Sequence, residues 1–83
     1  MEVNMKVEVY SKDACPWCVK AINLLETTDL DFEVHKLGED FSREELLEWF
    51  PDAKTFPVIT LDRMWIGGYD QLAEVVDEWK KED

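Results

Sequence analysis

Residues 5–25 read Met5-Lys-Val-Glu-Val-Tyr-Ser-Lys-Asp-Ala-Cys-Pro-Trp-Cys-Val-Lys-Ala-Ile-Asn-Leu-Leu25 and contain both cysteines of the chain. Apolar and polar side chains alternate from Met5 to Tyr10, which is the period-two pattern of a strand. From Pro16 to Leu25 apolar residues recur at helical spacing, and proline is favoured in the first turn of a helix. The stretch therefore predicts a strand, a polar loop and a helix, with a Cys-x-x-Cys at the start of the helix.

The residues that follow continue this order of elements. Residues 27–31 form a loop, and residues 32–37 alternate again, so the first three elements predict a parallel strand pair joined by a helix. Ser42 and Glu45 have the spacing of a capping box, and a short helix after them ends before Pro51. The first half of the chain thus predicts strand, helix, strand, helix.

A hairpin and a last helix complete the expected fold. Val58–Leu61 and Met64–Ile66 flank a two-residue turn and predict two antiparallel strands. Gly67 and Gly68 then break the pattern. The apolar stripe of the last helix consists of Leu72, Val75, Val76 and Trp79. The pattern predicts an α/β fold of order β-α-β-α-β-β-α, in which three helices flank a mixed four-stranded sheet, within a single domain of residues 1–83.

Composition narrows the function classes. The 83 residues suffice for one small domain, and 46% apolar residues indicate a folded chain rather than an acidic tail. The formal net charge of −11 disfavours binding to nucleic acid or to an anionic membrane surface. No apolar run reaches the roughly 18 residues of a membrane span, and the first residues lack the pattern of a signal peptide, so we expect a cytoplasmic protein.

The negative charge is unevenly distributed along the sequence. Residues 1–20 contain three acidic and three basic side chains, whereas residues 21–53 contain ten acidic and two basic ones. Both cysteines lie in the neutral segment, so we expect an active face that is less negative than the rest of the surface.

The Cys-x-x-Cys indicates redox chemistry. Backbone amides and the positive end of the helix dipole stabilise a thiolate at Cys15, which lowers its pKa from about 8.5, and Lys12 adds positive charge. Cys18, one turn further into the helix, should be less exposed. We therefore expect Cys15 to attack a disulfide and Cys18 to resolve the mixed disulfide that results.

Two other interpretations of the cysteine pair have less support. Zinc needs four ligands, and the chain offers only His35 besides the two cysteines, so we expect no metal site; His35 itself should be a surface or half-buried residue. Two inert core cysteines would not explain the position at the helix start. A disulfide between residues three apart closes too small a loop to stabilise a fold.

Three motifs together resemble the glutaredoxin family: Tyr10-Ser-Lys-Asp-Ala-Cys-Pro-Trp-Cys18, Thr55-Phe-Pro57 and Gly67-Gly-Tyr-Asp70. The resemblance covers essentially the whole chain. It implies the thioredoxin fold in its minimal form and glutathione-dependent thiol–disulfide exchange, with glutathione as reducing cosubstrate and no tightly bound cofactor. The short chain would suit a phage or small bacterial member of the family.

The resemblance also implies a glutathione site. Pro57 would follow a cis peptide bond beside the cysteines, and the backbone of Phe56, next to Thr55, would pair with glutathione; otherwise Pro57 simply begins a strand. Lys12 and Lys54 would meet the glycine-end carboxylate, and Trp17 would pack against the ligand. Trp17 replaces the usual Tyr, and Phe56 replaces a smaller Val, so substrate preference is less defined than reaction type.

The glycine motif would supply the other end of this site. Backbone amides near Tyr69, Asp70 and Gln71, after Gly68, would bind the γ-glutamyl carboxylate, and the Asp70 carboxylate would bind its amino group. Alternatively, or in addition, Asp70 could be the N-cap of the helix. The other three tryptophans, Trp49, Trp65 and Trp79, are expected in the core or partly in it.

The sequence thus predicts a monomeric dithiol glutaredoxin whose partners are glutathione and disulfide-containing proteins, with ribonucleotide reductase as a client by analogy. One alternative is a redoxin reduced by thioredoxin reductase. Another is a dimeric carrier that holds an iron–sulfur cluster through Cys15 and glutathione, which Pro16 disfavours by resemblance to the family. An interaction module without chemistry would explain neither cysteine.

Overall fold

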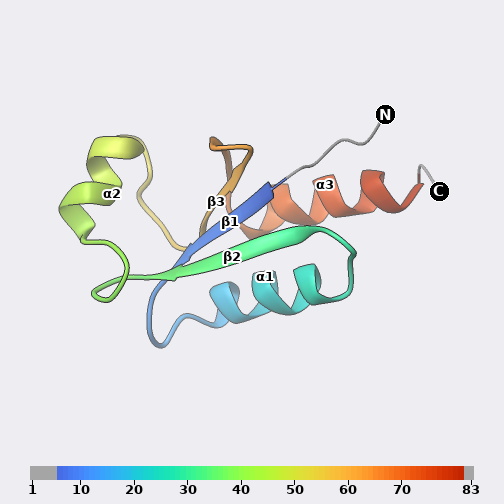
Figure 1. Ribbon diagram of the computed structural model, residues 1–83, viewed down its shortest axis with the longest axis horizontal. Coiled ribbons are helices and arrows are strands. Elements are labelled where there is room, and N and C mark those ends of the chain that lie inside the picture. The colour runs from blue at the N-terminus through green and yellow to red at the C-terminus, as the bar shows by residue number, and fades with distance from the viewer. Residues whose placement is uncertain (1–5, 82–83) are drawn as a thin grey trace.

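The computed structural model describes residues 6–81 and has the expected order of elements (Figure 1). Four strands and three helices follow one another as β1 (Lys6–Ser11), α1 (Pro16–Glu26), β2 (Asp31–Lys36), α2 (Arg43–Trp49), β3 (Val58–Leu61), β4 (Met64–Gly67) and α3 (Tyr69–Lys81). No helix in this part of the chain is both long and apolar enough to cross a membrane.

The four strands form one mixed sheet in the order β2-β1-β3-β4. β1 and β2 are parallel, with Glu8 opposite Glu33, and the other two neighbouring pairs are antiparallel. Asp62 and Arg63 form the turn between β3 and β4, and both have positive φ angles, 51° and 71°. Such angles are typical of a type I′ hairpin turn, whose twist matches that of the strands.

Helices α1 and α3 cover one face of the sheet, which we call the inner face. Val7 and Val9 of β1 and Ile59 of β3 point to this face and are fully buried. The rest of this core comes from α1, α3 and the loop before β2: Ala21, Leu25, Leu30, Leu72 and Val76. Because side chains alternate along a strand, the polar neighbours Glu8 and Thr60 point to the opposite, outer face.

Helix α2 lies beyond the carboxyl end of β2, apart from α1 and α3 (Figure 1). Ser42 and Glu45 form the expected capping box, in which each side chain accepts a hydrogen bond from the other residue's backbone amide. Leu46 is the buried residue of this helix. With Phe41, Ala53 and Val58 it forms a small second cluster.

Three sequence predictions need correction or adjustment. The first strand ends one residue later than expected, at Ser11, while its expected start at Met5 lies outside the described residues; the second strand begins and ends one residue earlier than expected. Trp49 and Trp65 are not in the core, because 49% and 41% of their surfaces are exposed. Each ring contacts only part of the second cluster and its neighbours, Trp49 against Tyr10 and Trp65 against Phe50, and the rest of each ring faces solvent. Trp79 is half-buried and packs against the main core, as expected.

Candidate functional site

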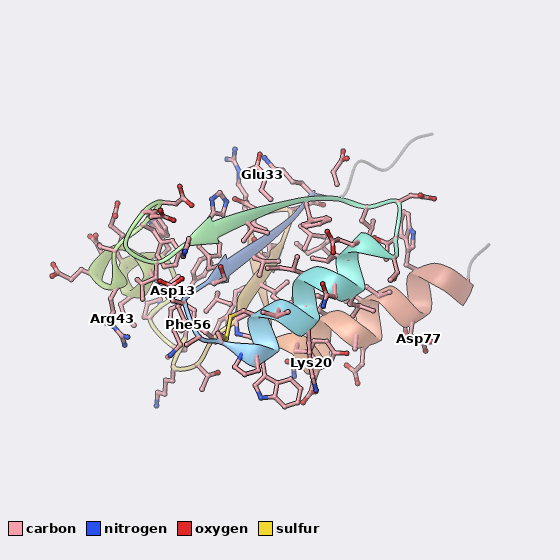
Figure 2. All side chains as sticks on the ribbon, turned by 90° about the horizontal axis from the view of Figure 1, so that it is seen from below. Asp13, Lys20, Glu33, Arg43, Phe56 and Asp77 are labelled. Atoms are coloured by element: carbon pink, nitrogen blue, oxygen red, sulfur yellow. A yellow bond between two sulfur atoms is a disulfide. The ribbon has the colours of Figure 1, made fainter. Side chains whose placement is uncertain are left out.

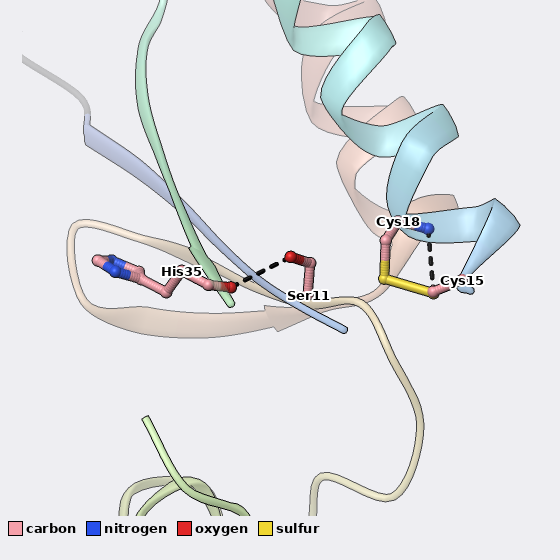
Figure 3. Close-up of a disulfide and its surroundings, with 4 residues drawn as sticks. All are labelled: Ser11, Cys15, Cys18 and His35. Carbon is pink, nitrogen blue, oxygen red and sulfur yellow. Dashed lines mark hydrogen bonds between the residues drawn. A yellow bond between two sulfur atoms is a disulfide. The ribbon is translucent and has the colours of Figure 1, made fainter. Parts of the chain in front are cut away.

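Cys15 and Cys18 are joined by a disulfide at the start of α1 (Figure 3). Cys15 is the N-cap of the helix, and its Sγ accepts a hydrogen bond from the backbone amide of Cys18 over 3.2 Å. Cys15 is 8% exposed and Cys18 only 2%. Cys15 is therefore the more accessible of the two residues, and its sulfur lies where the free amides of the helix end stabilise negative charge.

The Phe56–Pro57 peptide bond is cis, as the resemblance implied, and Pro57 is buried. The carbonyl oxygen of Pro57 lies so close to Gly68 that a Cβ atom there would be only 3.4 Å from it. The proline segment and the glycine turn, distant in sequence, are thus packed against each other.

A cavity of about 340 Å³ lies between these segments and the start of α1. Eight residues line it: Trp17, Thr55, Phe56, Pro57, Gly68, Tyr69, Asp70 and Gln71. These are eight of the nine residues predicted to bind the substrate; Lys12 is the ninth and is not part of the lining. The rings of Trp17 and Tyr69 are 5.6 Å apart and connect the starts of α1 and α3.

The glycine turn fixes the start of α3. Gly67 has a φ angle of +130°, which residues with a side chain rarely adopt, so glycine is favoured there. The amide of Gly68 donates a hydrogen bond to Gln71 Oε1 over 2.9 Å. Because the helix begins at Tyr69, Asp70 lies in its first turn, and the alternative of Asp70 as N-cap is wrong.

Two lysines place positive charge near the disulfide. Lys12 Nζ lies 5.3 Å from the centroid of the Phe56 ring, and Lys20 Nζ lies 4.5 Å from that of Trp17. These contacts bring charge to both sides of the cavity, although neither lysine lines it. Figure 2 labels Lys20 on α1 and Phe56 near the sulfur atoms. Lys54, the other predicted cation, is exposed.

The acidic residue nearest to Cys15 in sequence is paired with a base. Asp13 Oδ1 lies 2.7 Å from Lys36 Nζ at the end of β2. The hydrogen bond to Asp13, and then its charge, raise the pKa of Lys36 above its ordinary value. Because the charge of Lys36 neutralises that of Asp13, this acidic residue adds no net negative charge beside the redox site.

Sequence reasoning missed two of these basic residues. Lys36 reaches the loop before α1 because the parallel pairing of β1 and β2 places it opposite Ser11. The alternation of residues along β2 shows which side chains share a face, but it does not define this register. Lys20 lies three residues after Trp17, a helical spacing that brings two side chains onto one face, and this signal was present in the sequence. Ala14 in the same loop has a φ angle of 56°. Alanine rarely adopts this conformation, so nothing in the sequence signalled it.

This fold and this site define a class of protein. A dithiol pair at a helix start, beside a cis-proline and on a mixed four-stranded sheet, is the arrangement of a thiol–disulfide oxidoreductase with the thioredoxin fold.

Comparison with known proteins identifies the family. The family model described as glutaredoxin matches residues 7–66, and the chain belongs to this family. Glutaredoxin 3 of Escherichia coli K12 is 36% identical over 67 residues, which cover 80% of each protein.

Solved structures agree with this assignment. Glutaredoxin 1 of Francisella tularensis, crystallised with cacodylate, is 25% identical with a TM-score of 0.76, and the match covers 93% of this chain and 98% of that one. A buckwheat glutaredoxin in complex with glutathione shares the fold at 23% identity, with a TM-score of 0.72 over 89% of this chain and 70% of that one.

Proposed function

We propose that this protein uses glutathione to reduce protein disulfides and glutathione mixed disulfides. The observation that carries the proposal is the cavity of about 340 Å³ whose lining unites the three family motifs beside the disulfide. The buckwheat glutaredoxin, which has the same fold, forms a complex with glutathione. A tripeptide is of a size that suits such a cavity.

Cys15 is the proposed nucleophile. Its thiolate attacks the glutathione sulfur of a mixed disulfide, a new bond forms between Cys15 Sγ and that sulfur, and the client leaves as a thiolate that takes up a proton. A second glutathione thiolate then attacks the glutathione sulfur bound to Cys15. The products are oxidised glutathione and the free Cys15 thiolate, so the disulfide bond passes from the client to a pair of glutathione molecules, and one glutathione thiol is consumed.

Cys18 extends the reaction to disulfides within proteins. Cys15 attacks one sulfur of the client, and the resulting mixed disulfide is broken when the Cys18 thiolate attacks Cys15 Sγ. The client leaves as a dithiol, and the enzyme keeps the Cys15–Cys18 disulfide seen in the structure. Two glutathione molecules return it to the dithiol state.

The proposed pose of glutathione follows from charge. The amides at the start of α3 suit the γ-glutamyl carboxylate, and the Asp70 side chain suits its amino group. The backbone of Phe56 is proposed to pair with the peptide. Lys12, over the Phe56 ring, would attract the glycine carboxylate and offset the repulsion between the ligand and a chain of charge −11.

Further parts of the proposal concern the cellular setting. We propose a cytoplasmic monomer that holds no resident cofactor and acts on disulfide-containing clients. Ribonucleotide reductase is the proposed client by analogy with other short glutaredoxins. Size-exclusion chromatography tests whether the protein is a monomer, and an absorption spectrum tests whether it holds a cofactor. A brown dimeric preparation would instead support a carrier of an iron–sulfur cluster.

A coupled assay tests the reaction. A small glutathione mixed disulfide is offered with glutathione and glutathione reductase, and then with thioredoxin reductase as the only source of electrons. We expect turnover with the first system, and activity with the second alone would contradict the proposal. Cys15→Ser should abolish turnover, by at least about a thousandfold, because no nucleophile remains.

The matched control is Cys18→Ser. This variant should keep reduction of the glutathione mixed disulfide, since that reaction needs only Cys15, and should lose reduction of protein disulfides. Equal loss in both variants would contradict the assigned roles.

A further inference from the structure

The outer face of the sheet carries a group of side chains that the redox reaction does not use. Glu8 of β1 and Glu33 and His35 of β2 each offer one ligand atom, and these three atoms all lie within 4.8 Å of one another. His35 Nε2 is 2.8 Å from Glu8 Oε2 and 3.7 Å from Glu33 Oε2. The parallel register produces this arrangement, because Glu8 lies opposite Glu33 and His35 follows two residues later on the same face.

We propose that Glu8, Glu33 and His35 bind a zinc ion. Zinc accepts imidazole nitrogen and carboxylate oxygen at about 2.0–2.1 Å, so two ligand atoms of a tetrahedral site lie about 3.3 Å apart. The two distances from His35 Nε2, 2.8 and 3.7 Å, fall on either side of this value. Three protein ligands leave the fourth position of a tetrahedral site open.

A buried hydroxyl provides an independent observation. Thr60 is fully buried, and its Oγ1 has no hydrogen-bond partner among the described residues. Thr60 lies opposite Glu8 in the antiparallel register, so both side chains project from the outer face. A buried hydroxyl without a partner is costly. Beside a zinc site, Thr60 could donate to the Glu8 carboxylate or to a water on the metal, as such outer groups commonly do.

The surroundings orient the ligands and leave the site accessible. Lys6 Nζ lies 3.0 Å from Glu33 Oε1, so the other oxygen of Glu33 faces His35. The Tyr10 ring packs 5.0 Å from that of His35 and restricts its orientation. A cavity of about 390 Å³ reaches Glu8 from solvent; Glu8, Tyr10, Trp49, Phe50 and Arg63 line it.

The proposed site is separate from the thiols. In Figure 3 the His35 ring points away from the disulfide, on the other side of Ser11, whose hydroxyl donates a hydrogen bond to the His35 carbonyl oxygen. Figure 2 labels Glu33 along β2, away from the sulfur atoms. Zinc here would therefore need neither cysteine, and the inference does not depend on the proposed function.

Calorimetric titration tests the site. The full chain without a histidine tag is stripped of metal with a chelator and oxidised, so that the Cys15–Cys18 disulfide removes the thiols as competing ligands. Zinc chloride is then added. We expect one zinc ion per chain, and a binding constant at least about a hundredfold weaker in His35→Gln, since the nitrogen ligand is lost.

Matched variants separate coordination from charge. Glu33→Gln removes a ligand at a half-exposed position where folding tolerates the change, and it should weaken binding at least about tenfold. Glu26→Gln removes the same charge from an exposed residue at the end of α1, on the other side of the sheet, and should change binding by less than about twofold. Equal weakening in both glutamine variants would reduce the effect to general charge and overturn the proposal.

A second readout guards against misfolded variants. Zinc should raise the thermal unfolding temperature of the oxidised chain and leave that of His35→Gln unchanged. If the oxidised wild-type chain did not bind zinc, His35 would only pair with the carboxylates of Glu8 and Glu33, and the proposal would be overturned.

Discussion

The two faces of the sheet differ in what they contribute. On the inner face, α1 and α3 bury Val7, Val9 and Ile59 completely and hold the redox helix against the strands. On the outer face, the same strands present Glu8 and Thr60, and α2 covers only one end (Figure 1). Adjacent residues of one strand thus serve different purposes, because their side chains alternate between the faces.

This difference separates stability from specificity. Apolar burial on the inner face is the main source of folding free energy. The outer face, whose side chains include carboxylates, an imidazole and exposed tryptophans, contributes less to stability and leaves groups free to bind ligands. Substitutions on the two faces should therefore differ in both size and sign.

The largest stability effect should come from the inner face. Ile59→Ala removes three carbon atoms from a fully buried side chain and should lower the free energy of unfolding by about 2–5 kcal/mol, measured by urea denaturation. Val34→Ala is the control for burial: Val34 lies opposite Val9 on the same face but is 41% exposed, and its loss should cost about 0.5 kcal/mol. Equal costs would mean that burial does not decide the cost of a substitution on this face.

A smaller effect of opposite sign is expected one residue further on. Thr60→Val replaces a buried hydroxyl that lacks a partner by a methyl group of the same shape, and should raise the free energy of unfolding by about 1 kcal/mol. The measurement uses metal-free protein in the presence of a chelator, so that the proposed zinc site does not contribute. Destabilisation would show that the Thr60 hydroxyl is bonded in solution.

The smallest effect is expected at the hairpin turn. Arg63 has a φ angle of 71°, which costs side-chain-bearing residues about 1 kcal/mol and glycine almost nothing. Arg63→Gly should therefore stabilise the chain by about 0.5–1 kcal/mol in thermal unfolding. Arg63→Ala keeps the unfavourable φ angle and removes the same side chain, so a gain in both variants would assign the effect to the guanidinium instead.

Most of the fold could be predicted from the sequence. Short-range signals were sufficient for the helices and strands, since Pro16, the Ser42–Glu45 capping box and the glycine pair at 67–68 act within a few residues. The burial of Trp49 and Trp65 was wrongly predicted. A helical or alternating pattern shows which side chains share a face, but not whether another element covers that face.

The candidate site was predicted to a similar degree. The motif at 55–57 and the residues Gly68 to Gln71 do line one cavity with Trp17, as the family resemblance implied. The charge balance around the cysteines was harder to predict from the sequence. The pairing of Asp13 with Lys36 depends on the register between β1 and β2, which are separated by a helix in the sequence.

By itself, the sequence determined the order of the elements and placed a cysteine at a helix start, because hydrophobic periodicity and capping are local properties of the chain. The tertiary structure alone decided which distant groups meet: Pro57 with Gly68 at the redox site, and Glu8 with His35 on the outer face. Such contacts depend on strand order and register, which are determined by the packing of the whole sheet.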